Sequence, residues 1–229
     1  MHKIAILIAA GSLALSACAG PAIAEEPVNA PVAARVAKEG PGGKGGLKTA
    51  VFAGGCFWGV EGVFSHTKGV TGVVSGYHGG NAASAKYDIV SSGVTDHAEA
   101  VKVTYDPSVV RYDQLLRILF SVVADPTLKN RQGPDSGTQY RSAIVPMNPE
   151  QSAVAKAYLA QLGKSGLWSK PIATKIEPYK AFYAAEGYHQ DFMANNPKHG
   201  YIKRWDAPKV AAFKTMFPTL YRATYLTDA

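Results

Sequence analysis

The stretch VFAGGCFWGVEGVF, from Val51 to Phe64, decides the fold of this chain. Residues 48–55, KTAVFAGG, have the short apolar run and the closing glycines of a strand that ends in a turn. The next residues, CFWGVEGVFSH, have the apolar spacing of a helix despite their glycines. The stretch therefore predicts a strand, a sharp turn and a helix, with Cys56 at the junction.

Working outward, the remaining sequence alternates between strand and helix patterns. The predicted strands cover residues 71–78, 98–106, 140–146 and 173–179, and one well-buried helix covers residues 111–123. A further helix begins with Asn148 as N-cap, Pro149 at its first position and Gln151 able to reach back, and Gly163 is its predicted stop.

The order of these elements predicts the fold class. Strand, helix, strand, strand, helix, strand is the order of the split β-α-β unit of ferredoxin-like folds. We therefore expect an α+β fold with a ferredoxin-like split β-α-β core, additional helices and a long C-terminal extension. No second linker divides residues 47–229, so they are expected to form one domain. The polar stretch 124–140 is long and rich in turn residues, as functional loops often are.

The first residues are typical of an export signal, predicted over residues 1–24. Two processing sites compete. The run from Leu15 to Cys18 resembles a bacterial lipobox, the favoured reading, in which Cys18 carries lipid and becomes the N-terminus. The run from Ala22 to Ala24 fits an ordinary A-x-A cleavage site. Both predict a bacterial envelope protein, in the periplasm or anchored as a lipoprotein through Cys18, with a flexible tether over residues 25–46 rich in Pro, Gly and Ala.

The charge and the histidine content argue against two further classes of function, nucleic-acid binding and metal binding. The formal net charge is +7, but no run exceeds two basic residues, so nucleic-acid binding is not expected. The six histidines are scattered and give no metal-ligand spacing, so we expect neither a metal nor another cofactor. The chain is expected to be a monomer that meets the membrane only through the lipid anchor.

Cys56 is the only cysteine outside the export segment. At a helix N-terminus, unpaired N–H groups and the helix dipole favour a nucleophilic thiolate. The alternative is a small buried cysteine that only packs. Gly54 and Gly55 favour the reactive thiol, because they permit a sharp turn and close approach of a ligand. Phe57 and Trp58 cannot both point into the core, so one ring is expected to line a surface pocket beside the sulfur, although either alone is compatible with core packing.

Several motifs together resemble one known family. The GCFWG around Cys56 is similar to the signature of the peptide methionine sulfoxide reductase A family. Blocks that resemble the family's others follow in the same order: GYHGG (76–80), DHAEAVKVTYDP (96–107), DPT (125–127), GTQYRSAI (137–144) and YHQDF (188–192). The resemblance spans about residues 51–196. It implies an α+β sandwich related to the split β-α-β core, and the reduction of methionine-S-sulfoxide, free or in proteins, to methionine.

The resemblance also implies catalytic roles. Cys56 matches the nucleophile that attacks the sulfoxide sulfur. Glu99 matches an acid that donates a proton to the sulfoxide oxygen, and burial would favour its protonated form. Tyr87 and Tyr140 match two phenols directed at the same oxygen. Without the resemblance, Glu99 reads as a surface charge at a strand start, and each tyrosine as a core or rim residue.

The remaining implied site residues concern binding. Phe57 and Trp58 match the apolar pocket for the substrate methyl group. Asp135 matches an aspartate in the polar loop that orients water or the peptide, and is otherwise an ordinary turn former in residues 134–137. His189, in the YHQ block, is expected to be structural, as are His97 and His199.

The cysteine count predicts how the catalytic cycle closes. Attack by Cys56 is expected to leave a sulfenic acid. Many family members carry a resolving cysteine after a tyrosine near the C-terminus, but here Ile202 follows Tyr201 and no cysteine occurs beyond Cys56. An internal disulfide is therefore excluded unless Cys18 stays free and reaches the site. We expect an external thiol reductant: a thioredoxin-like protein, a glutaredoxin or glutathione. The expected partners are this reductant and oxidised methionine-containing proteins or peptides.

Two other functions fit the same residues. The domain could be a cysteine hydrolase in which His97 or His189 serves Cys56 as a base. It could also be a non-enzymatic module that binds oxidised or methionine-rich peptides through Phe57 and Trp58. Sulfoxide turnover separates these functions from the reductase.

Overall fold

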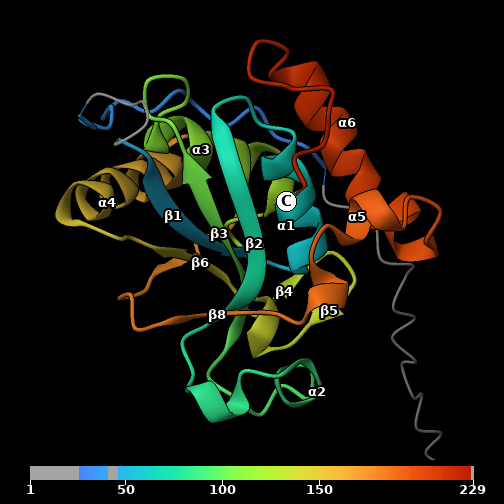
Figure 1. The fold of residues 1–229 in the computed structure, drawn as a ribbon. Helices are drawn as coiled ribbons and strands as arrows, with labels where there is room; N and C mark the ends of the chain where they lie inside the picture. The colour runs from blue at the N-terminus through green and yellow to red at the C-terminus, as the bar shows by residue number, and fades with distance from the viewer. Residues whose placement is uncertain (1–25, 41–45, 228–229) are drawn as a thin grey trace, which may run out of the picture.

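A computed structural model describes residues 26–40 and 46–227 of the chain. Its centre is a six-stranded sheet with the strand order β7-β6-β1-β3-β2-β8 (Figure 1). The strands are β1 (Lys48–Gly54), β2 (Val70–His78), β3 (Ala98–Tyr105), β6 (Ser142–Val145), β7 (Lys175–Ile176) and β8 (Phe182–Ala184).

The middle of the sheet is the split β-α-β unit that the sequence predicts. Helix α1 (Phe57–Ser65) connects β1 to β2, and β3 lies between these two strands, antiparallel to both. Strand β6 pairs antiparallel with the other edge of β1, with Val51 opposite Val145. This arrangement confirms the α+β fold with a ferredoxin-like core.

Alternation along β1 gives the sheet two different faces. Ala50 and Phe52 belong to the main core, which also contains the apolar faces of the helices. Val51 and Ala53 point to the other face, where a smaller cluster of mostly small residues is packed against Met147 and Phe182. The helices therefore cover mainly one face of the sheet, and the first turn of α1 follows directly from β1.

Two further helices pack into the same core as α1. Helix α3 (Tyr112–Ile118) continues into the π-helical segment η2 (Leu119–Val123), and α4 (Pro149–Lys164) packs beside α3 (Figure 1). As predicted, Asn148 caps α4 by accepting a bond from the N–H of Gln151. The predicted stop is wrong, because α4 runs through Gly163 to Lys164. The Gln151 side chain reaches back one residue further than expected, to the N–H of Met147.

The C-terminal extension is a second helical layer beside α1. It contains η4 (Gly187–His189), α5 (Phe192–Asn195), the π-helical segment η5 (Ile202–Asp206) and α6 (Ala207–Met216). Helices α5 and α6 both pack against α1, as Figure 1 shows. Strand β8 was not predicted. It pairs with the edge of β2 and leads the chain from the sheet to this layer.

Short elements build the remaining wall of the site. The polar stretch 124–140 contains the two-stranded hairpin of β4 (Arg131–Gln132) and β5 (Asp135–Ser136), followed by η3 (Thr138–Tyr140). Between β2 and β3 lie η1 (Ala82–Ser84) and α2 (Tyr87–Val90).

The expectation of a flexible tether is wrong for residues 26–40. Ala30, Ala33 and Ala37 are buried in the main core. The N–H of Ala37 donates to Asp113 of α3 at 3.0 Å, and Tyr158 of α4 donates to the carbonyl of Pro31 at 2.8 Å. Small alanines permit close packing on α3 and α4, and for that reason this segment without large apolar side chains is ordered. We call residues 26–40 the N-terminal strap.

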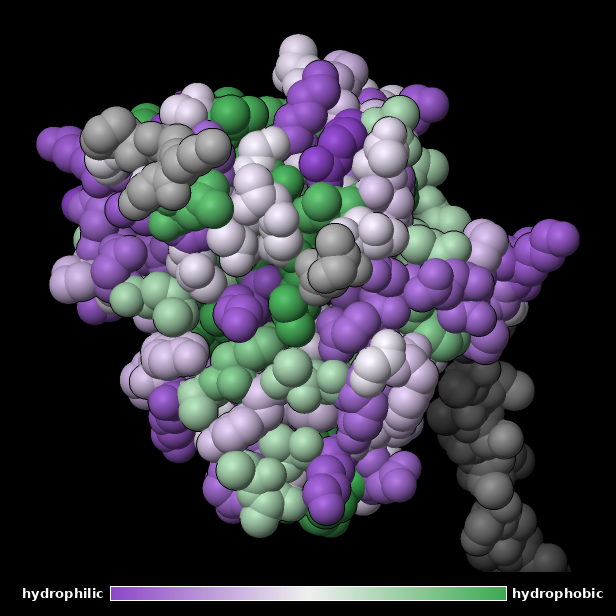
Figure 2. Space-filling view, viewed as in Figure 1, coloured by the Kyte–Doolittle hydropathy of each residue, from purple (hydrophilic) through white to green (hydrophobic). Residues whose placement is uncertain are grey.

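The predicted export signal, residues 1–24, lies outside the described residues. Among residues 26–40 and 46–227, no helix has the length and apolar character needed to cross a membrane. On the face seen in Figure 2, hydrophilic and hydrophobic residues are interspersed rather than gathered into separate regions.

Candidate active site

Cys56 occupies the junction that the opening stretch predicts. It is the N-cap residue of α1, and its side chain is nearly buried, with the residue 9% exposed. The turn before it requires Gly55, which has a φ of 91°. A Cβ atom there would lie 2.6 Å from Cβ of Gln132, so the glycine also lets the β4–β5 hairpin approach the cysteine.

The environment of the sulfur corrects one expectation. Burial raises the pKa of the Cys56 thiol well above its usual range, and the carboxylates of Glu99, Asp206 and Asp135 raise it further. A hydrogen bond from the N–H of Trp58 acts in the opposite direction but is the smallest of these effects. The free enzyme therefore holds a neutral thiol, not the thiolate that the helix N-terminus alone would favour.

Glu99 lies on β3 and is 2% exposed, so it is not the surface charge that the local pattern suggests. Its Oε2 accepts a 3.0 Å hydrogen bond from the N–H of Phe57, the residue after the cysteine. Burial raises the pKa of Glu99 to about 8, although the bond from Phe57 lowers it. At neutral pH the carboxyl is therefore protonated and available as an acid.

The two predicted phenols share this environment. Burial raises the pKa values of Tyr87 and Tyr140, and the charges of Glu99 and Cys56 raise both further. Tyr87 begins α2, where its N–H donates to Glu186 at 2.9 Å, and Tyr140 ends η3. Both phenols therefore keep their protons and act as neutral donors close to the acid and the thiol.

Phe57 and Trp58 take different positions. Phe57 is 1% exposed, and its ring centroid lies 5.9 Å from that of Tyr77, so it belongs to the core. Trp58 is partly buried and stacks on Phe192, with ring centroids 3.7 Å apart. Its indole N–H donates to Nδ1 of His189 at 3.1 Å. One ring therefore points into the core, and the other is held by the C-terminal extension.

The hydrogen bonds of two histidines argue against the hydrolase. Trp58 can only donate, so Nδ1 of His189 is an acceptor; burial lowers the pKa of this ring, and the proton lies on Nε2. In His97, Nδ1 accepts from the N–H of Gly80, and Nε2 bonds to the carbonyl of Asn81. Neither ring has a lone pair free to take the thiol proton. His189 was expected to be structural, and in this structure it accepts the hydrogen bond that fixes the Trp58 ring.

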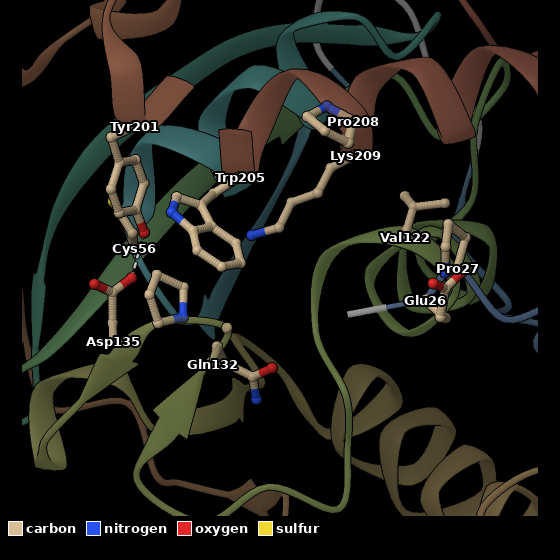
Figure 3. A pocket seen from close by; sticks show the side chains of 12 residues that line it. Glu26, Pro27, Cys56, Val122, Gln132, Asp135, Tyr201, Trp205, Pro208 and Lys209 are labelled. Carbon is tan, nitrogen blue, oxygen red and sulfur yellow. Dashed lines mark hydrogen bonds between the residues drawn. The ribbon is translucent and has the colours of Figure 1, made fainter. Parts of the chain in front are cut away.

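Cys56 opens into a cavity of about 190 Å³ between the β4–β5 hairpin and the C-terminal extension. Figure 3 shows Asp135 pointing up from the hairpin toward Tyr201, the amide of Gln132 turned away from the extension, and Tyr201, Trp205 and Lys209 descending from the extension. The Tyr201 hydroxyl donates to Asp135, which joins the two sides beside the sulfur. Neither Phe57 nor Trp58, the two rings predicted to form the substrate pocket, lines this cavity; residues of the hairpin and of the extension form its walls there.

Three site residues escaped the sequence analysis: Tyr201, Asp206 and Lys209. Asp206 is fully buried beside α1, and Lys209 Nζ lies 3.6 Å from its Oδ1. This segment was considered in the sequence analysis only because Ile202 stands where many family members have a cysteine. No motif indicates that Asp206 and Lys209 belong to the site. Across the described ranges, no cluster of three or more His, Cys, Asp or Glu side chains has the arrangement to hold a metal ion.

Comparison with known proteins agrees with this geometry. The sequence model described as peptide methionine sulfoxide reductase matches residues 48–220. A peptide methionine sulfoxide reductase MsrA 2 of Mesorhizobium japonicum is 56% identical over 176 residues, which cover 77% of this chain and 90% of that protein. A Synechocystis protein of the same description is 50% identical over 178 residues, covering 78% and 83% of the two chains.

Solved structures show the same fold. Reduced Mxr1 of Saccharomyces cerevisiae has a TM-score of 0.59 at 34% identity, covering 67% of this chain and 87% of that one. Methionine sulfoxide reductase A of Corynebacterium diphtheriae has a TM-score of 0.58 at 32% identity, covering 79% and 87%. The chain therefore belongs to the peptide methionine sulfoxide reductase family, as an MsrA-type oxidoreductase that reduces methionine sulfoxide to methionine.

Proposed function

We propose that this enzyme reduces the S epimer of methionine sulfoxide, free or in proteins, with Cys56 as nucleophile and Glu99 as proton donor. One observation carries this mechanism: Glu99 is a buried acid with a pKa of about 8, tied to the residue next to the thiol. A proton donor of this kind is needed at the sulfoxide oxygen when the sulfur is attacked.

The reaction transfers one oxygen atom from the sulfoxide sulfur to the Cys56 sulfur. The Cys56 sulfur bonds to the sulfoxide sulfur while Glu99 protonates the oxygen. The bond between that oxygen and the substrate sulfur then breaks, the oxygen bonds to the Cys56 sulfur, and the bond between the two sulfur atoms breaks, which releases methionine and leaves a sulfenic acid on Cys56. The substrate gains the two electrons that the cysteine loses, and the proton of the Cys56 thiol replaces the one that Glu99 donated.

The neighbouring side chains divide the rest of the task. Tyr87 and Tyr140 keep their protons and donate to the sulfoxide oxygen beside Glu99. Asp135 is held by Tyr201 at the mouth of the site and orients water or the peptide. Trp58, fixed by His189, lies outside the cavity of Figure 3, but its ring meets the cavity residue Tyr201 edge-on with centroids 5.9 Å apart, and we assign the substrate methyl group to this side of the sulfur. Phe57 stays in the core.

An external thiol closes the cycle. The sequence has no cysteine beyond Cys56, so the sulfenic acid meets no resolving thiol from the C-terminal extension. A thiol of glutathione, a glutaredoxin or a thioredoxin-like protein forms a mixed disulfide with Cys56 and releases water, and a second thiol then frees the enzyme.

The proposed site of action is the bacterial cell envelope, where the enzyme repairs oxidised proteins as a monomer. This part of the proposal rests on the export pattern of residues 1–24. Lipidation at Cys18 would anchor the enzyme at the membrane, whereas cleavage after Ala24 would release it into the periplasm. Mass spectrometry of the mature N-terminus in a bacterial host distinguishes the two.

A single turnover without reductant tests the chemistry. The purified domain is mixed with an excess of a racemic blocked methionine sulfoxide, and methionine is counted per enzyme for each epimer. We expect about one equivalent, from the S epimer alone, and a sulfenic acid on Cys56 that a dimedone-type reagent traps. Cys56→Ser is the matched control and should form none. Methionine formation by the Cys56→Ser protein would overturn the mechanism.

A further inference from the structure

Asp206 is a buried carboxylate to which the mechanism above gives no role. It ends the π-helical segment η5 and is fully buried. Its carboxylate lies against the first turn of α1, because a Cβ atom built on Gly59 would be only 2.2 Å from Oδ1. Gly59 is the third residue of the helix that Cys56 caps. The acid and the thiol therefore contact the same helical turn.

The partners of Asp206 only partly satisfy its charge. Neither carboxylate oxygen has a hydrogen-bond donor among residues 26–40 and 46–227. Lys209, one turn along in α6, forms an ion pair with Oδ1 at 3.6 Å. Burying a carboxylate without hydrogen bonds lowers the stability of the folded protein. A neutral residue of the same shape would pack in this position without that loss, so packing alone does not explain Asp206.

We propose that Asp206 is a positioning residue of the reaction, which acts from the C-terminal extension to set the protonation of Cys56 and Glu99. The proposal rests on the function proposed for these two residues. Asp206 touches neither substrate nor reacting atoms; it acts through its charge and through its hold on the first turn of α1.

Other charged groups face the same centre, and each has to be counted. Glu99 approaches from β3, Asp135 from β5, and Lys209 from α6. Titratable phenols also surround it: Tyr87, Tyr140 and Tyr201. Lys209 is the cation that lines the cavity, and it lowers the pKa values of both Asp135 and Asp206. Asp206 is thus one of three carboxylates around the thiol, and the one that the sequence motifs do not mark.

The sign of its effect follows from its own ionisation. Burial raises the pKa of Asp206 to about 6, and Lys209 opposes this rise, so the carboxylate is charged at neutral pH. A charge there raises the pKa of Cys56 and the pKa of Glu99 together. Asp206 thus keeps two protons on the pair until substrate arrives, and it protects the resting thiol from other electrophiles and oxidants.

The test measures thiol reactivity without any sulfoxide. Cys56 is alkylated with neutral iodoacetamide over a range of pH in the wild type, in Asp206→Asn and in Asp206→Ser. Removal of the charge should move the profile of both variants to lower pH by about one unit, which makes alkylation about tenfold faster below the midpoint. The pH profile of kcat/KM for sulfoxide should move in the same direction.

The matched control is Asp96→Asn, which removes an exposed carboxylate from the loop before β3 and should leave the profile unchanged. Unshifted profiles in the Asn and Ser variants would overturn the proposal, as would failure of both to fold, since the carboxylate would then be structural. Because alkylation needs no turnover, a shifted profile in a protein that does not reduce sulfoxide would support this role of Asp206 while refuting the proposed function.

Discussion

The backbone N–H of Phe57 donates a 3.0 Å hydrogen bond to Oε2 of Glu99, which ties the first residue of α1 to the central strand β3. The two residues are 42 positions apart in sequence. Their contact depends on the antiparallel pairing of β1 with β3, which brings the end of one strand to the beginning of the other. The sheet itself therefore holds the acid beside the thiol.

Glu99→Gln tests this acid directly. The glutamine keeps a carbonyl oxygen that accepts from Phe57 but has no proton of comparable acidity to donate. We expect single-turnover reduction of the sulfoxide to slow by about 100-fold to 10,000-fold, the usual contribution of a general acid, with little change in substrate affinity. Stopped-flow measurement with the wild type as reference checks this. A rate within a factor of about three of the wild type would assign the proton to another group.

The pH dependence of kcat/KM follows from the same pair. With the pKa of Glu99 at about 8 and that of Cys56 higher, both groups hold protons at neutral pH. The reactive state has one proton fewer, so kcat/KM should rise toward about pH 8 and then level off. In Glu99→Gln only the thiol titrates, and the rising limb should move above pH 8. A limb in the same place in both proteins would contradict this assignment.

Glu99 should also make stability depend on pH. Its pKa is raised from 4.5 to about 8, so between these values the unfolded chain loses a proton that the folded protein keeps. The folded state is therefore progressively destabilised as the pH rises through this window, by on the order of a few kcal/mol in total. Glu99→Gln removes this loss. Urea denaturation should show the variant gaining on the wild type from pH 5 to pH 8, and a constant difference would show that the acid is ionised in the folded protein.

The hydrogen bond from Trp58 to His189 gives a fourth prediction. In His189→Ala the indole loses its acceptor, while stacking on Phe192 remains. We expect KM for sulfoxide to rise several-fold, with the alkylation of Cys56 little changed. His199→Ala is the matched control, since His199 meets Trp58 only by an edge contact at 6.0 Å. An equal rise in both variants would mean that ring packing, and not the hydrogen bond, positions Trp58.

The sequence predicted what local pattern controls. The β1–α1 junction, the central strands and the cap of α4 all depend on residues close in sequence, and Cys56 and Glu99 lie in a recognisable motif. What it missed depends on contacts between distant segments. The three-residue strand β8 has no period to detect, and nothing near Asp206 indicates that Gly59 leaves room for its carboxylate.

The thiolate expectation failed for a related reason. A helix N-terminus favours an anion when it is considered alone, but burial and three carboxylates oppose the charge of Cys56 in the folded protein. Two of these carboxylates, Asp135 and Asp206, come from segments more than 75 residues away in sequence. The pKa of Cys56 depends on burial and on side chains from distant segments, so a local sequence motif cannot predict it.

The N-terminal strap gives the last prediction. Glu39 accepts hydrogen bonds from the Tyr105 hydroxyl and from the N–H of Tyr112, and thereby holds the strap to β3 and to the start of α3. Glu39→Ala leaves both donors unpaired, so the free energy of unfolding should fall by about 1–3 kcal/mol. Lys38→Ala, whose side chain is exposed, should change it little. If urea denaturation gives equal values for the two variants, the hydrogen bonds of Glu39 do not contribute to stability; a lower value for Glu39→Ala alone means that the strap is part of the folded domain.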